Sequence, residues 1–241
     1  MSKLLSILKR RSTALNASAV VVAAGTASRM QGIDKILAPL GDVPVLVRTL
    51  NVFQACSDIA EIVIVTREDL LVEIGKLCKD YSLDKVSKIV VGGSARVYSV
   101  RAGLREVSRD TQLIAIHDGA RPFLSARVLK EVLHQAAVSG AAAPAVAVND
   151  TIKRAENNIV TETVDRSCLW AIQTPQVFQA DLIRAAVEKA AEDHAPVTDD
   201  CSAVERLGMK VVLTEGDRQN IKITTPFDLL LGEAILKERG E

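Results

Sequence analysis

Short runs of branched aliphatic residues alternate along the chain with segments of helical periodicity. Runs that are apolar at nearly every position are typical of strands buried on both faces, as in a parallel sheet covered by helices. The predicted strands are residues 19–23, 62–66, 88–91, 113–116, 145–148 and 211–214. Their alternation with helices predicts an α/β fold, with a Rossmann-like, mostly parallel sheet and helices on both faces.

Polar residues and a proline mark the ends of several predicted helices. Ser125 can cap a helix that has one apolar face, and Gly140 stands at the exit of that helix. Thr225 precedes Pro226, which is the expected order of an N-cap and a proline at the first helical position. Ser94 precedes a third helical pattern and is the expected cap there.

The segment 150–178 departs from this alternation. It contains short extended pieces around the polar pair Asn157 and Asn158, and it has little helical periodicity. Two strands joined by such a turn predict a β-arm inserted into the fold, and we expect this arm to mediate dimerisation. Because there is no internal repeat or low-complexity linker, residues 1–241 are expected to form a single domain that carries the insertion.

Composition then narrows the classes of function. The 241 residues include 30 Lys plus Arg and 30 Asp plus Glu, so the chain lacks the basic excess of a nucleic-acid or anionic-membrane binder. No apolar run is long enough to cross a membrane. The four cysteines lie far apart, which predicts reduced thiols in the core rather than a zinc site or a disulfide framework. The segment 1–16 does not have the order of a signal peptide, so we expect a cytoplasmic protein.

A phosphate-binding turn is predicted where the first strand ends. Residues 23–30 read AAGTASRM, and Lys35 follows. Small side chains let backbone N–H groups approach an anion, and a cation completes such a site. A plain tight turn followed by surface cations explains the same residues and stays open at this point. Neither a dinucleotide fingerprint nor a Walker A motif fits, because the further glycines and the Gly-Lys-Ser/Thr sequence are missing after Gly25.

Polar groups recur where other predicted strands end. Arg96 and Ser99 follow a glycine pair, and Asp118 and Arg121 follow the strand 113–116. In an open α/β sheet, ligands bind at the carboxyl ends of the strands, near a reversal of strand order. Each residue alone is more simply a cap, a turn or a solvated side chain, and only their joint recurrence indicates a site. His117 is placed for acid–base work, but a histidine at a strand end more often makes a structural hydrogen bond.

Taken together, these motifs resemble the 2-C-methyl-D-erythritol 4-phosphate cytidylyltransferase family of the non-mevalonate isoprenoid pathway. The resemblance spans residues 20–234, and the motifs stand in the order that the family has. They are AAGTASRM with Lys35, GG-x-x-R-x-x-SV at 92–100, HDGARP at 117–122, DTIKR at 150–154, TVDR at 163–166, QTPQ-x-F at 173–178, TDD-x-SA-x-E at 198–205 and NIKIT at 220–224.

The resemblance implies transfer of CMP from CTP to methylerythritol phosphate, with release of pyrophosphate. It implies that Arg29 and Lys35 stabilise charge at the α-phosphate and that Lys222 bridges this phosphate and the attacking one. Arg166 would reach the substrate phosphate from the arm of a partner subunit, in a homodimer. The nucleotide contacts that it implies are Ala23, Ala24, Gly25, Gly93, Ser94 and Ser99. The acceptor contacts are Asp118, Arg121, Thr151, Thr174 and Thr198. Mg²⁺ is expected to bind mainly through the phosphates of CTP, with few or no protein ligands.

Some positions depart from the family pattern. Ala27 replaces a usual loop glycine, Asp34-Lys35-Ile36 replaces a usual Pro-Lys-Gln, and Gly119 replaces a frequent alanine. Asp34 thereby places a negative charge next to Lys35. Relatives that activate ribitol 5-phosphate share most of these motifs, so this polyol phosphate is the alternative acceptor. A non-catalytic paralogue that senses CTP and a dinucleotide-dependent oxidoreductase are the hypotheses from other classes, and the missing glycines argue against the second.

Overall fold

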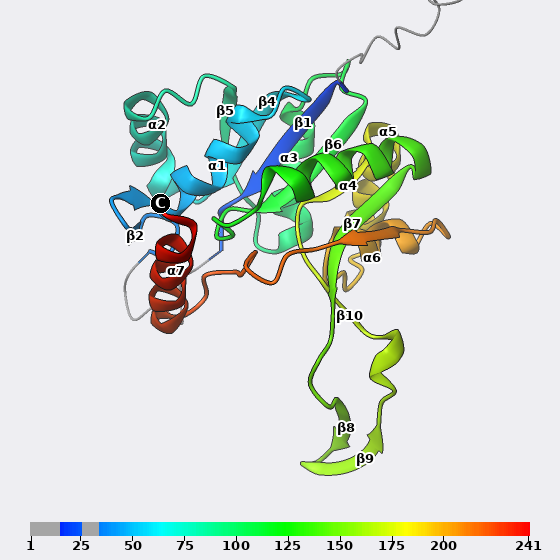
Figure 1. Cartoon of the computed structure of the whole chain (residues 1–241). Helices are drawn as coiled ribbons and strands as arrows, with labels where there is room; N and C mark the ends of the chain where they lie inside the picture. Colours follow the sequence, from blue (N-terminus) through cyan, green and yellow to red (C-terminus); the bar gives the residue numbers. More distant parts are fainter. Residues whose placement is uncertain (1–14, 26–33) are drawn as a thin grey trace, which may run out of the picture.

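The computed structural model describes residues 15–25 and 34–241 (Figure 1). Within these residues, eight strands form one sheet in the order β10-β7-β11-β6-β1-β4-β5, with β12 paired to β7. The strands are β1 (Ala17–Val22), β4 (Ile59–Thr66), β5 (Val86–Val91), β6 (Leu113–Asp118), β7 (Ala141–Ala147), β10 (Trp170–Ile172), β11 (Gln176–Gln179) and β12 (Val212–Glu215). Most of the segment 1–16 lies outside the described residues, and so do Ala27 and Arg29.

Strand β1 lies at the centre of the parallel part of the sheet. It pairs in parallel with β4 on one side and with β6 on the other, and β4 pairs in parallel with β5. The chain therefore adds β4 and β5 on one side of β1 and then places β6 on the other side. The strand order reverses at β1. The predicted α/β architecture is confirmed, and each predicted strand is present with shifted ends.

Strand β7 pairs antiparallel with β10 and β11 and in parallel with β12. Strand β11 runs antiparallel between β6 and β7, and β10 pairs with the following residues of β7. Ala142 pairs with both Val177 of β11 and Val212 of β12, so β12 lies on the other side of β7. A separate short ribbon, β2 (Pro39–Leu40) with β3 (Val43–Pro44), leads into the first helix.

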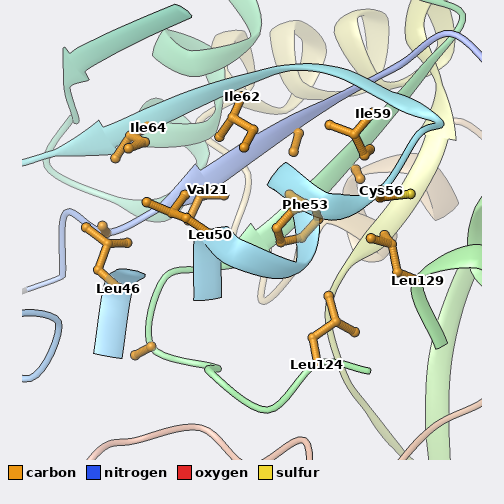
Figure 2. Packing of buried hydrophobic residues seen from close by; sticks show 14 of the residues in the cluster. Val21, Leu46, Leu50, Phe53, Cys56, Ile59, Ile62, Ile64, Leu124 and Leu129 are labelled. Carbon is orange, nitrogen blue, oxygen red and sulfur yellow. The ribbon is translucent and has the colours of Figure 1, made fainter. Parts of the chain in front are cut away.

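Alternating side chains of the sheet separate two hydrophobic layers. Ala19 and Val21 of β1 belong to one buried cluster and Val20 to the other, because successive side chains of a strand point to opposite faces. Residues of α1 (Val45–Ala55), α2 (Leu71–Asp80), α4 (Ala126–Ser139) and α7 (Pro226–Arg239) pack in the first layer. Residues of α3 (Arg96–Glu106), α5 (Ala180–Glu192) and α6 (Asp200–Glu205) pack in the second. Figure 2 shows the first layer, where Phe53 and Leu50 of α1 lie against the sheet. Helices thus cover both faces, as predicted.

Two of the three predicted helix caps are present. The Ser125 side chain accepts a hydrogen bond from the N–H of Val128 at 3.3 Å, and Gly140 ends α4 with a left-handed φ of 85°. Thr225 and Asp228 satisfy each other's backbone N–H groups at the start of α7. Ser94 does not cap α3, because Ala95 occupies the N-cap position without a side-chain hydrogen bond.

The arm projects from the sheet as the hairpin of β8 (Lys153–Glu156) and β9 (Ile159–Thr163), at the bottom of Figure 1. Asn157 and Asn158 form its turn with φ values of 49° and 64°, in the left-handed region that asparagine tolerates. Every residue of both strands is exposed. The prediction extends the arm to residue 178, but residues 170–172 and 176–179 form β10 and β11 and belong to the main sheet.

Two expectations from composition concern membranes and thiols. Across residues 15–25 and 34–241, none of the helices combines the length and the apolar character that crossing a membrane requires. Cys56 and Cys201 are buried free thiols, as predicted, whereas Cys78 is half-buried and Cys168 is exposed. The exposed thiol lies in η2 (Arg166–Cys168), a short 3₁₀ turn between β9 and β10 that has no buried residue, so no core surrounds it.

Helix α3 approaches the sheet closely at Gly103. A Cβ at this position would lie 2.6 Å from Val20 Cγ1 and 2.7 Å from Val65 Cγ2, and both valines are fully buried. We therefore expect Gly103→Ala to lower the free energy of unfolding by about 1–3 kcal/mol, because overpacking outweighs the gain in helix propensity. Gly75 of α2 is a matched control, since its Cβ would lie 3.9 Å from Ile89 Cδ1. Gly75→Ala is expected to be neutral or stabilising, and equal effects of the two substitutions in urea denaturation would contradict the close approach.

Candidate active site

The carboxyl ends of the parallel strands meet at one edge of the sheet and line a cavity of about 620 Å³. Its wall includes residues that follow β1, β4 and β5, the start of α3, the end of β6 and part of the segment before α7. The cavity therefore lies where the strand order reverses, which is the general position of ligand sites in open α/β sheets.

The turn after β1 brings a lysine next to open backbone. The N–H of Ala23 donates to the carbonyl of Val65 at 2.7 Å, so the chain still follows the sheet at this residue. A Cβ built on the exposed Gly25 would lie 3.8 Å from Lys35 Nζ. The ammonium group of Lys35 therefore stands beside the backbone of Gly25. This combination of a cation and uncovered backbone suits a phosphate group.

The glycine pair after β5 is held against the start of α3. A Cβ on Gly92 would lie 2.6 Å from Ala24 Cβ and 2.8 Å from Ser99 Oγ, so a larger residue does not fit there. The N–H of Gly93 donates to Ser99 Oγ at 3.1 Å, and the Ser99 hydroxyl faces the Ala95 carbonyl at 3.2 Å. Ser99 is buried, and it holds a loop whose Gly93 and Ser94 are exposed to the cavity.

Three cations surround the carboxylate of Asp118 at the end of β6. Arg96 Nη1 lies 2.7 Å from Oδ1, while Lys222 Nζ and Arg121 Nε lie 2.9 Å and 3.4 Å from Oδ2. Arg96 also binds Asp200 through Nη2, at 2.6 Å. Burial alone would raise the pKa of Asp118, but the charges of Arg96 and Lys222 outweigh it and hold that pKa well below its usual range. Asp118 is therefore an anion that fixes three cationic side chains from separate elements.

A chain of buried hydrogen bonds links the backbone of Asp118 to Thr174 and His117. The N–H of Asp118 donates to Thr174 Oγ1 at 3.1 Å, and Thr174 Oγ1 lies 3.0 Å from His117 Nδ1. His117 Nε2 lies 3.2 Å from the Arg121 carbonyl, which can only accept, so Nε2 carries the proton and Nδ1 accepts from Thr174. Burial lowers the pKa of His117 to about 4. The imidazole is therefore neutral and fully engaged, which supports the structural interpretation of His117 over the acid–base one.

Comparison with known proteins gives one consistent family. The family model for IspD, 2-C-methyl-D-erythritol 4-phosphate cytidylyltransferase, matches residues 17–238. The chain belongs to this family. It is 44% identical over 226 residues to the 2-C-methyl-D-erythritol 4-phosphate cytidylyltransferase of Geobacillus kaustophilus, a match that covers 93% of this chain and 99% of the relative. The protein of the same name from Halalkalibacterium halodurans is 45% identical over 223 residues, which cover 92% of this chain and 97% of the relative.

Solved structures agree with this family assignment. The 4-diphosphocytidyl-2C-methyl-D-erythritol synthase of Anaerococcus prevotii has a TM-score of 0.82 at 30% identity, over 93% of this chain and 97% of that one. The 2-C-methyl-D-erythritol 4-phosphate cytidylyltransferase of Thermus thermophilus has a TM-score of 0.76 at 32% identity, over 90% and 98%. As a member of this family, the chain is a nucleotidyltransferase of the non-mevalonate pathway, and the resemblance drawn from its motifs is confirmed.

Most of the residues predicted for the cytidylyltransferase site come together in the cavity. The six predicted nucleotide contacts all line it: Ala23, Ala24, Gly25, Gly93, Ser94 and Ser99. Lys35, Lys222 and Asp118 line it as well, whereas Arg29 lies outside the described residues. Arg121 and Thr174 contact Asp118 but do not line the cavity, so within one chain they support the wall.

Three other predicted residues do not line this cavity. Arg166 is exposed on η2 and donates a hydrogen bond to the carbonyl of Asn149. Thr151 is exposed where the arm begins, and Thr198 is exposed before α6. One chain alone therefore does not bring Arg166, Thr151 and Thr198 to the cavity.

Three charged residues of the site had no predicted role. Arg67 lines the cavity directly after β4, and Arg96 joins Asp118 to Asp200. The place of Arg96 in the motif GG-x-x-R marks it in the sequence, and Arg67 follows a predicted strand as the other site residues do. Asp200 has only 4% of its surface exposed, and the motif TDD gives no sign of that burial.

The buried His117 makes stability depend on pH in a defined window. Its pKa is about 4 in the folded chain and 6.5 in the unfolded one, so between these values the unfolded chain binds more protons. Stability therefore falls as pH drops below about 6.5, and this group accounts for about 2 kcal/mol between pH 7.5 and pH 5. His117→Gln lacks this titration, and urea denaturation across the range is expected to give it a shallower pH slope. A slope equal to that of the unsubstituted chain would show that His117 is not buried in its neutral form.

Proposed function

We propose that this cavity binds CTP and 2-C-methyl-D-erythritol 4-phosphate and transfers CMP to the acceptor, which is the reaction of the family. The observation that carries the proposal is the presence of two lysines in one cavity, Lys35 beside Gly25 and Lys222 beside Asp118. A phosphate oxygen of the acceptor attacks the α-phosphorus and forms a P–O bond. The bond from the α-phosphorus to its bridging oxygen breaks, and pyrophosphate leaves.

This reaction requires alignment of the two substrates and compensation of the charge on their phosphates, and it does not require a protein base. The attacking phosphate oxygen is already an anion, so no side chain has to remove a proton from it. A neutral, fully hydrogen-bonded His117 agrees with that requirement. Fixed cations that face the phosphates hold two polyanions together and stabilise the charge that grows in the transition state.

The nucleotide half of the cavity is built from small residues. Ala23, Ala24 and Gly25 leave room for the nucleotide, and Lys35 faces the α-phosphate. The family resemblance gives the same role to Arg29, which lies outside the described residues. One such cation contributes about 3–4 kcal/mol to transition-state stabilisation. The loop at Gly93 and Ser94, which Ser99 holds in place, contacts the cytosine through its backbone groups.

The acceptor half is centred on Asp118. The Asp118 carboxylate keeps Lys222 in place between the attacking phosphate and the α-phosphate, and 40% of the Lys222 side chain stays exposed for that contact. Arg121 and Thr174 keep Asp118 oriented. Thr151 and Thr198 contact the acceptor once the arm of a partner subunit completes the site.

The arm completes the site in a homodimer. Among residues 15–25 and 34–241, no other element buries its strands, and the apolar side chains of Ile159 and Val160 are 70% and 57% exposed. Such side chains favour a partner surface. We infer that the partner subunit covers this hairpin and that Arg166 crosses with it to bind the acceptor phosphate of the other subunit.

We propose that magnesium would bind at this site together with CTP. Within the described residues, no group of three or more His, Cys, Asp or Glu side chains is arranged to hold a metal, and Asp118 is already bound by cations. The ion would take its ligands mainly from the phosphate oxygens of CTP and would offset charge among the phosphates. We propose that the reaction takes place in the cytoplasm, in agreement with four unpaired thiols.

The acceptor is tested directly by pyrophosphate release. With CTP and magnesium, methylerythritol phosphate is expected to give release at least about tenfold faster than ribitol 5-phosphate, because it is the acceptor for which the family is named. Fast release with ribitol 5-phosphate alone would assign the alternative acceptor. Binding of CTP without product from either acceptor would indicate the CTP-sensing paralogue. Binding of a nicotinamide cofactor without CTP binding would indicate the oxidoreductase.

Sharing of the site between subunits is tested by mixing two inactive variants. Lys35→Ala and Arg166→Ala are each expected to lose most turnover, while Lys35→Ala keeps most of its CTP binding. A mixed dimer contains one site with both native side chains, so equal mixing after subunit exchange is expected to restore about a quarter of the native activity. Lys130→Ala, at an exposed position of α4, is the control and keeps full turnover. No recovery on mixing would show that Arg166 acts within its own chain.

A further inference from the structure

An ion pair at the edge of the cavity joins the end of β4 to the residue before Lys35. Arg67 Nη2 lies 2.7 Å from Asp34 Oδ2, with 25% and 18% of the two side chains exposed. Arg67 also makes two hydrogen bonds of 3.0 Å to Asp69, but that carboxylate is 65% exposed. The pair with Asp34 is therefore the more sheltered of the two and is screened less by solvent.

The Asp34 carboxylate also organises the turn that carries Lys35. Its Oδ1 accepts the N–H of Ile36 at 3.2 Å, and its backbone carbonyl accepts the N–H groups of Leu37 and Ala38 at 3.1 Å and 2.9 Å. At the other end of this turn, Ile36 is buried and its carbonyl accepts the N–H of Leu46 in α1 at 2.9 Å. Lys35 thus stands between two fixed points, one in α1 and one at the end of β4.

Charge gives the same pair a second effect. A carboxylate next to Lys35 weakens the positive potential that a phosphate would meet there. Arg67 contacts Asp34 and opposes that charge, so the positive potential at Lys35 is weakened less than by an unpaired Asp34. The departure of Asp34 from the family pattern is therefore matched, in this chain, by a cation in direct contact with it.

We propose that Arg67 is a positioning residue for the reaction: by binding and neutralising Asp34, it keeps Lys35 oriented toward the α-phosphate of CTP. This inference rests on the proposed function, in which Lys35 acts at that phosphate. Arg67 acts through Asp34 and Lys35 rather than through contact with the nucleotide. It therefore affects the chemical step more than the binding of CTP.

Steady-state kinetics with CTP and the acceptor separate this role from direct binding. Arg67→Gln is expected to lower kcat about 10- to 100-fold with little change in the KM for CTP, because it leaves Asp34 uncompensated beside Lys35. Adding Asp34→Asn removes that charge, while its amide oxygen can still accept from Ile36. The double variant is therefore expected to recover at least about threefold in kcat over Arg67→Gln alone. Asp69→Asn is the matched control, since it removes the exposed partner of Arg67 and is expected to keep native kcat.

The outcomes distinguish the possible roles. Native kcat in Arg67→Gln, or no recovery in the double variant, would overturn the inference. A raised KM for CTP with kcat unchanged would overturn it too, since Arg67 would then bind the nucleotide itself. Thermal unfolding within a few degrees of the native value for all variants excludes loss of the fold as the cause. An unsubstituted chain without turnover would overturn the proposed function and this inference together, whereas active wild type with unaffected variants overturns the inference alone.

Discussion

The carboxylate of Asp118 is the point on which the arrangement of the site depends. It lies at the end of β6, and Arg96 from α3, Arg121 from the following turn and Lys222 from the segment before α7 all contact it. Three positive side chains packed together repel one another, and a buried anion among them makes their closeness favourable. Removing this carboxylate would take the acidic partner from Arg121 and Lys222 and leave Arg96 with Asp200 alone. The site is thus organised around an acid, although the ligands that we propose for it are themselves anions.

The overall charge of the chain says little about such a site. The sequence has equal numbers of basic and acidic residues, yet the cavity contains Lys35, Arg67, Arg96 and Lys222. Asp34, Asp118 and Asp200 bind two of these arginines and one of the lysines. Acidic side chains therefore hold the basic ones in position. What distinguishes the site is the orientation of its basic side chains, not a large excess of positive charge. Long-range attraction of substrate would be modest in such a protein, while contact with a bound polyanion would be strong.

Local signals made part of this structure predictable. Strands such as β1 and β6 are apolar at nearly every position, and Ser125 with Gly140 brackets a helix, so these features do not depend on distant partners. Strands β10 and β11 were not predicted, because short segments such as Trp170–Ile172 become strands only by pairing with β7. The same limit applies to the site. Motifs marked Asp118 and Lys222, but the link from Arg96 to Asp200 joins residues 104 positions apart, and no local pattern reveals such a contact.

The β8–β9 hairpin has a consequence for how this chain can vary. Its side chains are exposed, so they escape the volume constraints that the two buried layers impose on the sheet and its helices. In the proposed homodimer, substitutions there are limited by the partner surface that covers the hairpin, not by the core of its own subunit. In the homodimer that we propose, a change in one arm is also a change in the other, because both come from one gene. Each substitution in this segment therefore appears in both subunits at once. The arms of two diverged relatives would stop fitting each other well before the packing of their sheets became different.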